Sequence, residues 1–447
     1  MMLQLRPLGI VLPCWAFPWW VWKRCSYVGS DDSNQWSLAT AEEFEPVPHI
    51  CRLILAVYEF DLGHPKFAPP AGYGIQPDWV VKRVHYDQTQ GRAPPYLIYM
   101  DHEHQEIVLA MRGLNIASES DYMILLDNRL GMQMFDGGYV HHGLIKAAVW
   151  LLNQETDTLL ELWRANGCSY KMVFAGHSLG SGVAALMTII VVNHRDRLGG
   201  IPRSLIRCYA VAPARSMSLN LAVRYADVIH SVVLQDDFLP RTSTPLEDHL
   251  KAICCLPCLI FFMCLRDTWI PEEKRLMDPR RLYAPGRVYH IVERKFCRCG
   301  RFPPEVRTAI PVDGRFEHIV LSCNAASDHE IISITRESTK ALEVMMENIP
   351  VTEPPSRQRF EKKQTLEKEH KDALERAVSL NVPHAVSSTD RPTDDIHVVI
   401  ESNGNEVPLS ELKPSGITTS WDALIERLFS KDESGSLILN KDIKMED

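Results

Sequence analysis

Long apolar runs are scarce in this chain of 447 residues. Two stretches stand out, residues 8–22 and residues 252–265. Both are shorter than the roughly 20 residues that a membrane-spanning helix needs. The first also lacks the small-residue cleavage site of a secretory signal peptide, and the chain holds no Asn-X-Ser/Thr sequon. We therefore expect neither a spanning helix nor a disulfide framework among the 12 cysteines.

Runs of basic residues are also missing. The chain has 57 acidic and 48 basic side chains and a net charge of −9, which argues against general nucleic-acid binding. Cys255-x-x-Cys258 with Cys297-x-Cys299 is a spacing that a zinc site could use. Acylated cysteines beside the apolar stretch and buried inert thiols are the alternatives that we favour. We expect no cofactor and no metal.

One pentapeptide carries most of the information, Gly176-His177-Ser178-Leu179-Gly180. A strand-like run, residues 170–175, precedes it, and an apolar run without proline, residues 181–193, follows it. Strand, sharp turn and helix are the setting of a nucleophile elbow, whose strained turn needs small residues on both sides of the serine. The helix N-terminus would also favour the negative charge that develops in the reaction. The pattern predicts Ser178 as the nucleophile and a structural role for His177.

A serine nucleophile of this kind needs an acid and a histidine, in that order along the chain. Residues 228–234 resemble a strand, and Asp236 and Asp237 follow its end. The carboxyl ends of parallel strands are where an α/β sheet places its working groups. Either aspartate fits this position.

Two histidines downstream compete for the role of base. Ser327, with Glu330 three residues later, resembles a capping box that would place His329 in the first turn of a helix. That position would keep its imidazole neutral. His318 begins a strand-like run, residues 316–322, and would lie at the wrong edge of a parallel sheet. We favour His329 on this geometric ground.

At the level of the whole chain, the sequence resembles the class 3 (fungal-type) lipases, in the plant-type branch related to sn-1-specific diacylglycerol lipases. The resemblance covers about residues 45–350 and implies an α/β-hydrolase fold, with Asp237 as the acid of a Ser178-His329-Asp237 triad. Its motifs are Ile107-Val108-Leu109-Ala110-Met111-Arg112-Gly113, His141-His142-Gly143, Gly176 to Gly180, and Asp237-Phe238-Leu239-Pro240-Arg241, with Ser327-Asp328-His329 downstream.

One position departs from the family pattern. The family often has serine or threonine after the Arg-Gly pair, where this chain has Leu114. The resemblance implies an oxyanion hole made by the backbone N–H groups of Leu114 and Leu179. Losing one donor of such a hole costs about 3 kcal/mol, so Leu114 bears on rate and not on reaction type.

The order of segments predicts the domain organisation. Strand-like runs (107–111, 171–175, 206–212 and 228–234) alternate with helical ones such as residues 143–165, which predicts a mostly parallel sheet flanked by helices. We expect a Trp-rich apolar segment and linker over residues 1–45 and the catalytic domain over residues 46–350. Residues 351–447 are expected to form a charged, largely disordered tail with short helices. One of these, around Trp421 to Leu428, would fold back or dock a protein partner.

Taken together, these features predict a serine lipase that hydrolyses mono-, di- or triacylglycerols, with diacylglycerol favoured. Phospholipase or acyltransferase chemistry on the same site, and an idle hydrolase fold acting as an adaptor, are the alternatives. Tryptophans beside cations in residues 15–24 are typical of a membrane interface. We expect an intracellular protein associated with the cytoplasmic face of a membrane.

Overall fold

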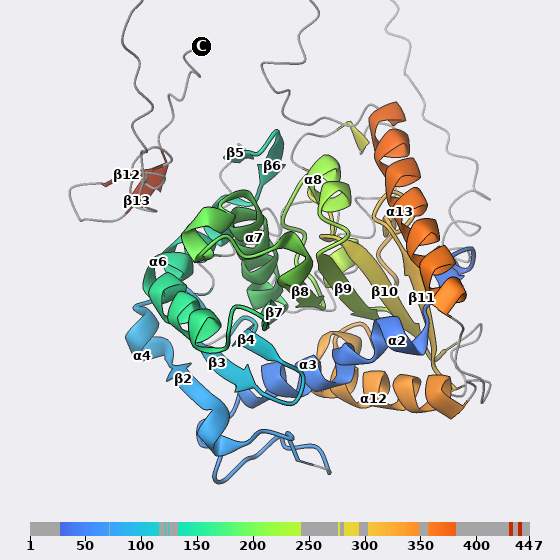
Figure 1. The fold of residues 1–447 in the computed structure, drawn as a ribbon. Coiled ribbons are helices and arrows are strands. Elements are labelled where there is room, and N and C mark those ends of the chain that lie inside the picture. Colours follow the sequence, from blue (N-terminus) through green and yellow to red (C-terminus); the bar gives the residue numbers. More distant parts are fainter. Residues whose placement is uncertain are drawn as a thin grey trace, which may run out of the picture.

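The computed structural model in Figure 1 describes residues 27–70, 72–115, 121, 124, 133–242, 276–277, 281–294, 303–347, 356–380, 429–431 and 437–439. The tail segment around Trp421 to Leu428, residues 8–22 and 252–265, and the cysteines at 255, 258, 297 and 299 lie outside these residues. Among the described helices, none combines the length and the apolar composition needed to cross a membrane.

A nine-stranded sheet organises the described chain, in the order β1-β11-β10-β9-β8-β7-β4-β3-β2. Its five central strands run parallel, and the strands at both edges pair antiparallel. The strands are β1 Ser37–Leu38, β2 Val80–Val84, β3 Tyr96–Asp101, β4 Glu106–Met111, β7 Lys171–His177, β8 Ile206–Val211, β9 Ile229–Leu234, β10 Arg287–Val292 and β11 Glu305–Ala309. A parallel centre brings the carboxyl ends of these strands to one edge, where a site can form.

Helices cover both faces of the sheet (Figure 1). One face carries α6 (His142–Ala165), α7 (Leu179–Asn193) and α8 (Leu219–Arg224), and the other carries α3 (Pro46–Ala56) and α12 (Ile331–Glu347). Shorter elements are α2 (Ala41–Phe44), α4 (Tyr86–Thr89) and two small hairpins, β5 (Gln133–Phe135) with β6 (Gly138–Val140) and β12 (Phe429–Lys431) with β13 (Leu437–Leu439). This is an α/β-hydrolase architecture with a mostly parallel central sheet, as predicted.

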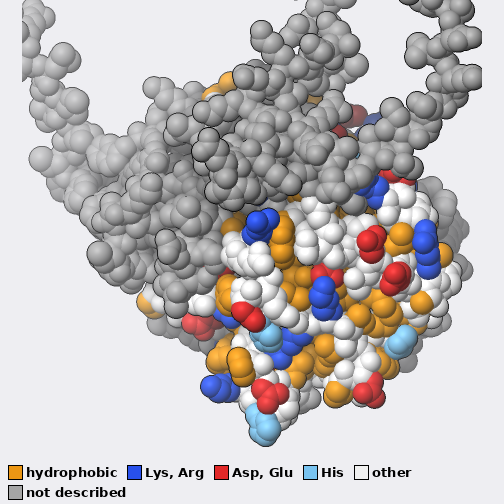
Figure 2. Space-filling model, turned by 90° about the vertical axis from the view of Figure 1, so that its left-hand side faces the viewer, with side chains coloured by type: hydrophobic (Ala, Val, Ile, Leu, Met, Phe, Trp, Pro, Cys, Tyr) orange, Lys and Arg blue, Asp and Glu red, His pale blue; other side chains and the backbone are white. Residues whose placement is uncertain are grey.

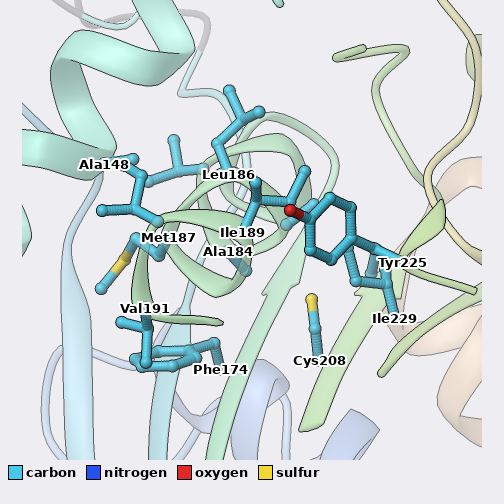
Figure 3. Packing of buried hydrophobic residues seen from close by; sticks show 14 of the residues in the cluster. Ala148, Phe174, Ala184, Leu186, Met187, Ile189, Val191, Cys208, Tyr225 and Ile229 are labelled. Carbon is cyan, nitrogen blue, oxygen red and sulfur yellow. The ribbon is translucent and has the colours of Figure 1, made fainter. Parts of the chain in front are cut away.

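Helix α7 is buried on all sides. Every residue from Leu179 to Val192 is buried, and Figure 3 shows Leu186, Met187 and Ile189 packed among residues of neighbouring strands and helices. A helix that is apolar all round belongs in a core rather than on a surface. Because dense packing of this kind resists movement, the N-terminus of α7 is a rigid platform.

Most elements predicted from the sequence are confirmed. The four predicted strands correspond to β4, β7, β8 and β9, and the two predicted helices correspond to α6 and α7. The strand predicted over residues 316–322 is wrong, because that segment is a loop. In that loop the carbonyl of Phe316 accepts a hydrogen bond from the Arg215 guanidinium at 2.6 Å instead of from a neighbouring strand.

The packed structure extends past both predicted domain boundaries. On the N-terminal side, β1 pairs with β11, and the N–H of Gly29 donates to Asp236 at 2.9 Å. On the C-terminal side, α13 (Ser356–Ser379) lies against α8, where His370 Nε2 bonds to the carbonyl of Val223 at 2.7 Å. Described residues on either side of 46–350 therefore contribute to the same fold.

The visible face in Figure 2 carries acidic and basic side chains intermixed with apolar ones. No broad region of one charge sign covers the described residues of that face.

Candidate active site

Ser178 stands at the sharp turn between β7 and α7. Its φ of 53° and ψ of −116° are a strained combination for a residue with a side chain. A Cβ atom on Gly176 would lie 2.2 Å from the carbonyl oxygen of Gly180, and one on Gly180 would lie 2.4 Å from that of Arg112. The small residues of the pentapeptide are therefore required by close backbone contacts, as the nucleophile-elbow pattern predicts.

The three side chains expected at the reacting centre lie in one hydrogen-bonded series. His329 Nε2 is 2.9 Å from Ser178 Oγ, and His329 Nδ1 is 2.9 Å from Asp237 Oδ1. Asp237 is fully buried and also accepts the N–H of Leu239 at 3.0 Å. A carboxylate acceptor at Nδ1 leaves Nε2 as the acceptor for the serine hydroxyl. Ser178 can thus donate its proton to His329.

The structure distinguishes the paired candidates. Asp236 points into another network, where its Oδ1 accepts from Gly29 and its N–H donates to Asp328 Oδ2 at 3.0 Å. The ring of His318 packs edge-on against Tyr27, with centroids 5.9 Å apart. The hydrogen-bonded series that starts at Ser178 therefore contains His329 and Asp237, and it contains neither Asp236 nor His318.

The local structure of His329 differs from the prediction. It ends a 3-10 turn, Ser327–His329, and α12 begins two residues later at Ile331. Glu330 between them has extended backbone angles, and Ser327 Oγ donates to the carbonyl of Asn324 instead of capping a helix. The predicted position in the first turn of an α-helix is therefore wrong.

Buried polar contacts hold the turn that carries His329. Asp328 accepts from the guanidinium of Arg294 and from the N–H of Asp236. Gln235 Oε1 in turn accepts the N–H groups of Glu293 and Arg294, at 2.9 and 3.0 Å. The loop that carries Asp237 and the turn that carries His329 are thereby fastened to each other and to the end of β10.

His177 belongs to a second series of hydrogen bonds behind the serine. Its Nε2 donates to the carbonyl of His329 at 2.7 Å, so its Nδ1 accepts the hydroxyl of Tyr58 at 2.7 Å. The Tyr58 oxygen accepts the N–H of Gly113 at 2.6 Å. Burial, aided by the neighbouring imidazole of His329, lowers the pKa of His177 to about 3, and burial raises that of Tyr58 to about 12. Both groups stay neutral at physiological pH.

The loop after β4 lies directly against the nucleophile. A Cβ atom on Gly113 would be 2.9 Å from Ser178 Cβ. The N–H of Gly113 is engaged by Tyr58, and the N–H of Asn115 donates to Asp121 at 2.7 Å. Between them lies the N–H of Leu114, the group that the family resemblance assigns to the oxyanion hole.

Sequence reasoning missed Tyr58, Arg294 and Asp328 as supports of the site. Tyr58 lies 119 positions before His177, and no local pattern connects the two. Asp328 stands next to His329, so its proximity in the chain was a signal that could have identified it.

Comparison with known proteins finds relatives among the lipases. The family model for lipase (class 3) matches residues 108–247, and that for the lipase 3 N-terminal region matches residues 10–75. Diacylglycerol lipase-beta of Mus musculus is 29% identical over 167 residues, which are 35% of this chain and 23% of that protein. Diacylglycerol lipase-alpha of Homo sapiens is 22% identical over 294 residues, 56% of this chain and 27% of that protein.

The chain thus spans about a quarter of the length of these curated relatives. Among solved structures, the triacylglyceride lipase of Rhizomucor miehei aligns with 67% of this chain and 95% of its own, at 16% identity and a TM-score of 0.41. The two family models together cover both the N-terminal segment and the region of the elbow. On these matches, the chain is similar to the class 3 lipases over residues 10–75 and 108–247, a similarity that supports a carboxylic ester hydrolase.

Proposed function

We propose that the chain is a serine lipase that hydrolyses acylglycerol esters, with diacylglycerol as the favoured substrate. The observation that carries the proposal is the series Ser178 Oγ, His329 Nε2 and Nδ1, Asp237 Oδ1, with both distances at 2.9 Å, beside a strained elbow. The preference for diacylglycerol rests on the likeness to the diacylglycerol lipases alone.

The proposed reaction proceeds in two halves. Ser178 Oγ attacks the ester carbonyl while His329 takes its proton, and His329 then returns that proton to the departing alcohol. Asp237 keeps His329 in the required tautomer and stabilises its protonated form. Water, activated by His329, attacks the acyl-enzyme, releases the fatty acid and restores the serine.

The oxyanion of each tetrahedral intermediate would be held by two backbone N–H groups. Leu179 opens α7, and the first N–H groups of a helix have no acceptor within it. Leu114 supplies the second from the loop that touches Ser178. Both supports are backbone groups, so Leu114 can act without the hydroxyl common at this position in the family.

The substrate class is tested by comparing head groups on one surface. Diacylglycerol, triacylglycerol and phosphatidylcholine with identical acyl chains are presented in the same mixed micelles, and fatty-acid release is measured. Ser178→Ala protein serves as the blank. The proposal expects the fastest release from diacylglycerol. Faster release from phosphatidylcholine would favour phospholipase action instead, and no release above the blank would contradict a lipase.

We also propose that the protein works at a membrane surface, through residues 8–22 and 252–265 together. The match of the family's N-terminal model to residues 10–75 supports a shared role for the first stretch. A single weak anchor gives marginal binding, so two are expected to act jointly. Cell fractionation measures how much of each variant is recovered with membranes. A variant with both stretches altered should shift further to the soluble pool than a variant with one stretch altered. Equal membrane recovery of all variants would contradict this.

A further inference from the structure

Two histidines and an aspartate meet at the edge of the sheet opposite the active site. Asp101 ends β3 and pairs with Glu106, the first residue of β4. Strand β4 runs parallel to β7, whose far end leads into Ser178. His49 comes from the first turn of α3, and His104 from the turn that joins β3 to β4. The cluster therefore joins the helix to the sheet at a place that the proposed reaction does not use.

The ligand-type atoms of the three residues converge. His49 Nε2 and His104 Nδ1 each lie 2.8 Å from the same oxygen, Asp101 Oδ2. All three atoms lie within 4.8 Å of one another. The two imidazole rings stack, with centroids 4.6 Å apart and planes inclined by 28°. Both rings thus present a nitrogen toward one carboxylate.

The carboxylate is fixed from behind. Asp101 is 1% exposed, and its Oδ1 accepts the N–H groups of Glu103 and His104, each at 3.0 Å. These two bonds hold the carboxylate plane and turn Oδ2 toward the histidines. A ligand held by outer hydrogen bonds in this way is typical of metal sites.

His49 faces the same carboxylate oxygen as His104. Its Nε2 is buried and lies 2.8 Å from Asp101 Oδ2, in a contact that is poorly aligned for a hydrogen bond. A cation at this point would satisfy the lone pairs of the nitrogen and the oxygen together.

We propose that His49, Asp101 and His104 bind one zinc ion. Two imidazoles and one carboxylate are an established zinc ligand set, with water in the fourth position. Imidazole nitrogens also disfavour calcium and magnesium, which prefer oxygen ligands. Zinc bonds of about 2.1 Å in a tetrahedron place ligand atoms about 3.3 Å apart. The imidazoles must therefore move outward by about 0.5 Å, which His104 can do because its side chain is 35% exposed on a turn.

Zinc at this site stabilises the fold and takes no part in ester hydrolysis. It ties α3, which packs on the sheet, to the β3–β4 turn. An ion that binds the folded chain and not the unfolded one raises the melting temperature by mass action. The inference is independent of the proposed function, because its readouts are metal content and stability.

The test uses the full-length chain, stripped of metal with a chelator and titrated with Zn²⁺ against a chromophoric competitor. The proposal expects a site with a stoichiometry of one per chain, and a rise of a few °C in melting temperature on saturation. His49→Gln and His104→Gln should each weaken binding at this site by tenfold or more and abolish the thermal shift. His102→Gln is the matched control, since His102 lies in the same turn but bonds Tyr170 Oη at 2.9 Å.

Co²⁺ replaces Zn²⁺ in a second measurement that separates this site from cysteine ligands. Visible bands without a thiolate charge-transfer band support nitrogen and oxygen ligands. The proposal would be overturned if both histidine variants still bound the metal ion as tightly as the wild-type chain. It would also be overturned by a thiolate band at the tight site, or if the wild-type chain bound no metal ion. Far-UV circular dichroism checks each variant, and His104→Gln, on the exposed turn, decides the outcome if His49→Gln does not fold.

Discussion

His177, the residue before the nucleophile, donates its Nε2–H to the backbone carbonyl of His329 at 2.7 Å. The elbow therefore binds the proposed base at two points, through Ser178 Oγ to its ring and through His177 to its backbone. The second contact fixes the tautomer of His177 and, through Tyr58, reaches the N–H of Gly113. One series of hydrogen bonds thus connects the base to the loop of the proposed oxyanion hole.

Tyr58→Phe should lower kcat by about 10- to 100-fold and leave KM nearly unchanged. The change removes the hydroxyl that links Gly113 to His177, so Leu114 and His329 are held less accurately, and small misplacements are costly in rate. Steady-state kinetics on a soluble short-chain ester measure both constants. Tyr73→Phe is the control, because its buried hydroxyl bonds Glu59, away from the serine series. Equal kcat losses in the two variants would show that the effect is one of general stability.

Asp237→Asn should reduce kcat by about 10⁴-fold, since an amide favours the wrong tautomer of His329. Asp236→Asn should lose far less activity, because Asp236 contacts Gly29 and Asp328 and not the histidine. The two purified variants are compared by kcat after their folding is checked. A comparable loss in both would contradict the assignment of Asp237.

His329→Ala should abolish ester hydrolysis while the protein still folds. His318→Ala should instead lower the melting temperature, because its ring packs against Tyr27, and should keep most of the activity. Kinetics and thermal unfolding of both variants separate these effects. An active His329→Ala protein beside an inactive His318→Ala protein would reverse the roles.

Acid should destabilise the fold through its buried histidines. Burial is the main cause that lowers the pKa values of His177 and His290 to about 3, from about 6.5 in the unfolded chain. Between these values the unfolded state binds more protons, so the free energy of unfolding falls as the pH falls below about 6.5. Each histidine contributes a slope of up to about 1.4 kcal/mol per pH unit.

Urea unfolding at pH 7, 6 and 5 measures this slope. In His290→Gln protein, the free energy of unfolding should change less steeply with pH, because one of the contributing histidines is gone. The variant should also be less stable than the wild-type chain at every pH. A flat profile in the wild-type chain would contradict the buried, neutral state of these side chains.

The local sequence pattern was sufficient to predict the parts of the site that are formed by residues adjacent in the chain. The elbow from Gly176 to Gly180 has a fixed strand, turn and helix around it, so its position and its helix α7 could be predicted from the sequence. The rule for parallel sheets placed an acid at the end of β9 but left Asp236 and Asp237 open, and the family resemblance chose Asp237. His329 needed a long-range argument, and its local structure was predicted wrongly because Glu330 interrupts the helix.

Contacts between distant segments could not be predicted from local pattern. The pairing of β1 with β11 joins residues far apart in the sequence, and no local pattern indicated it. The same holds for Tyr58 with His177, and for His49 with Asp101. In each case the partners come together only through the packing of the whole sheet and its helices.

The central claim is that Ser178 is the nucleophile, and covalent labelling tests it most directly. Wild-type chain is treated with a fluorophosphonate, digested, and examined by mass spectrometry while residual esterase activity is followed. We expect one adduct on Ser178 that forms as activity is lost, with no adduct there in His329→Ala protein. Folded Ser178→Ala protein should be unlabelled and lose activity by about 10⁴-fold or more. Adduct formation at another residue, or most of the activity retained by folded Ser178→Ala protein, would contradict the account.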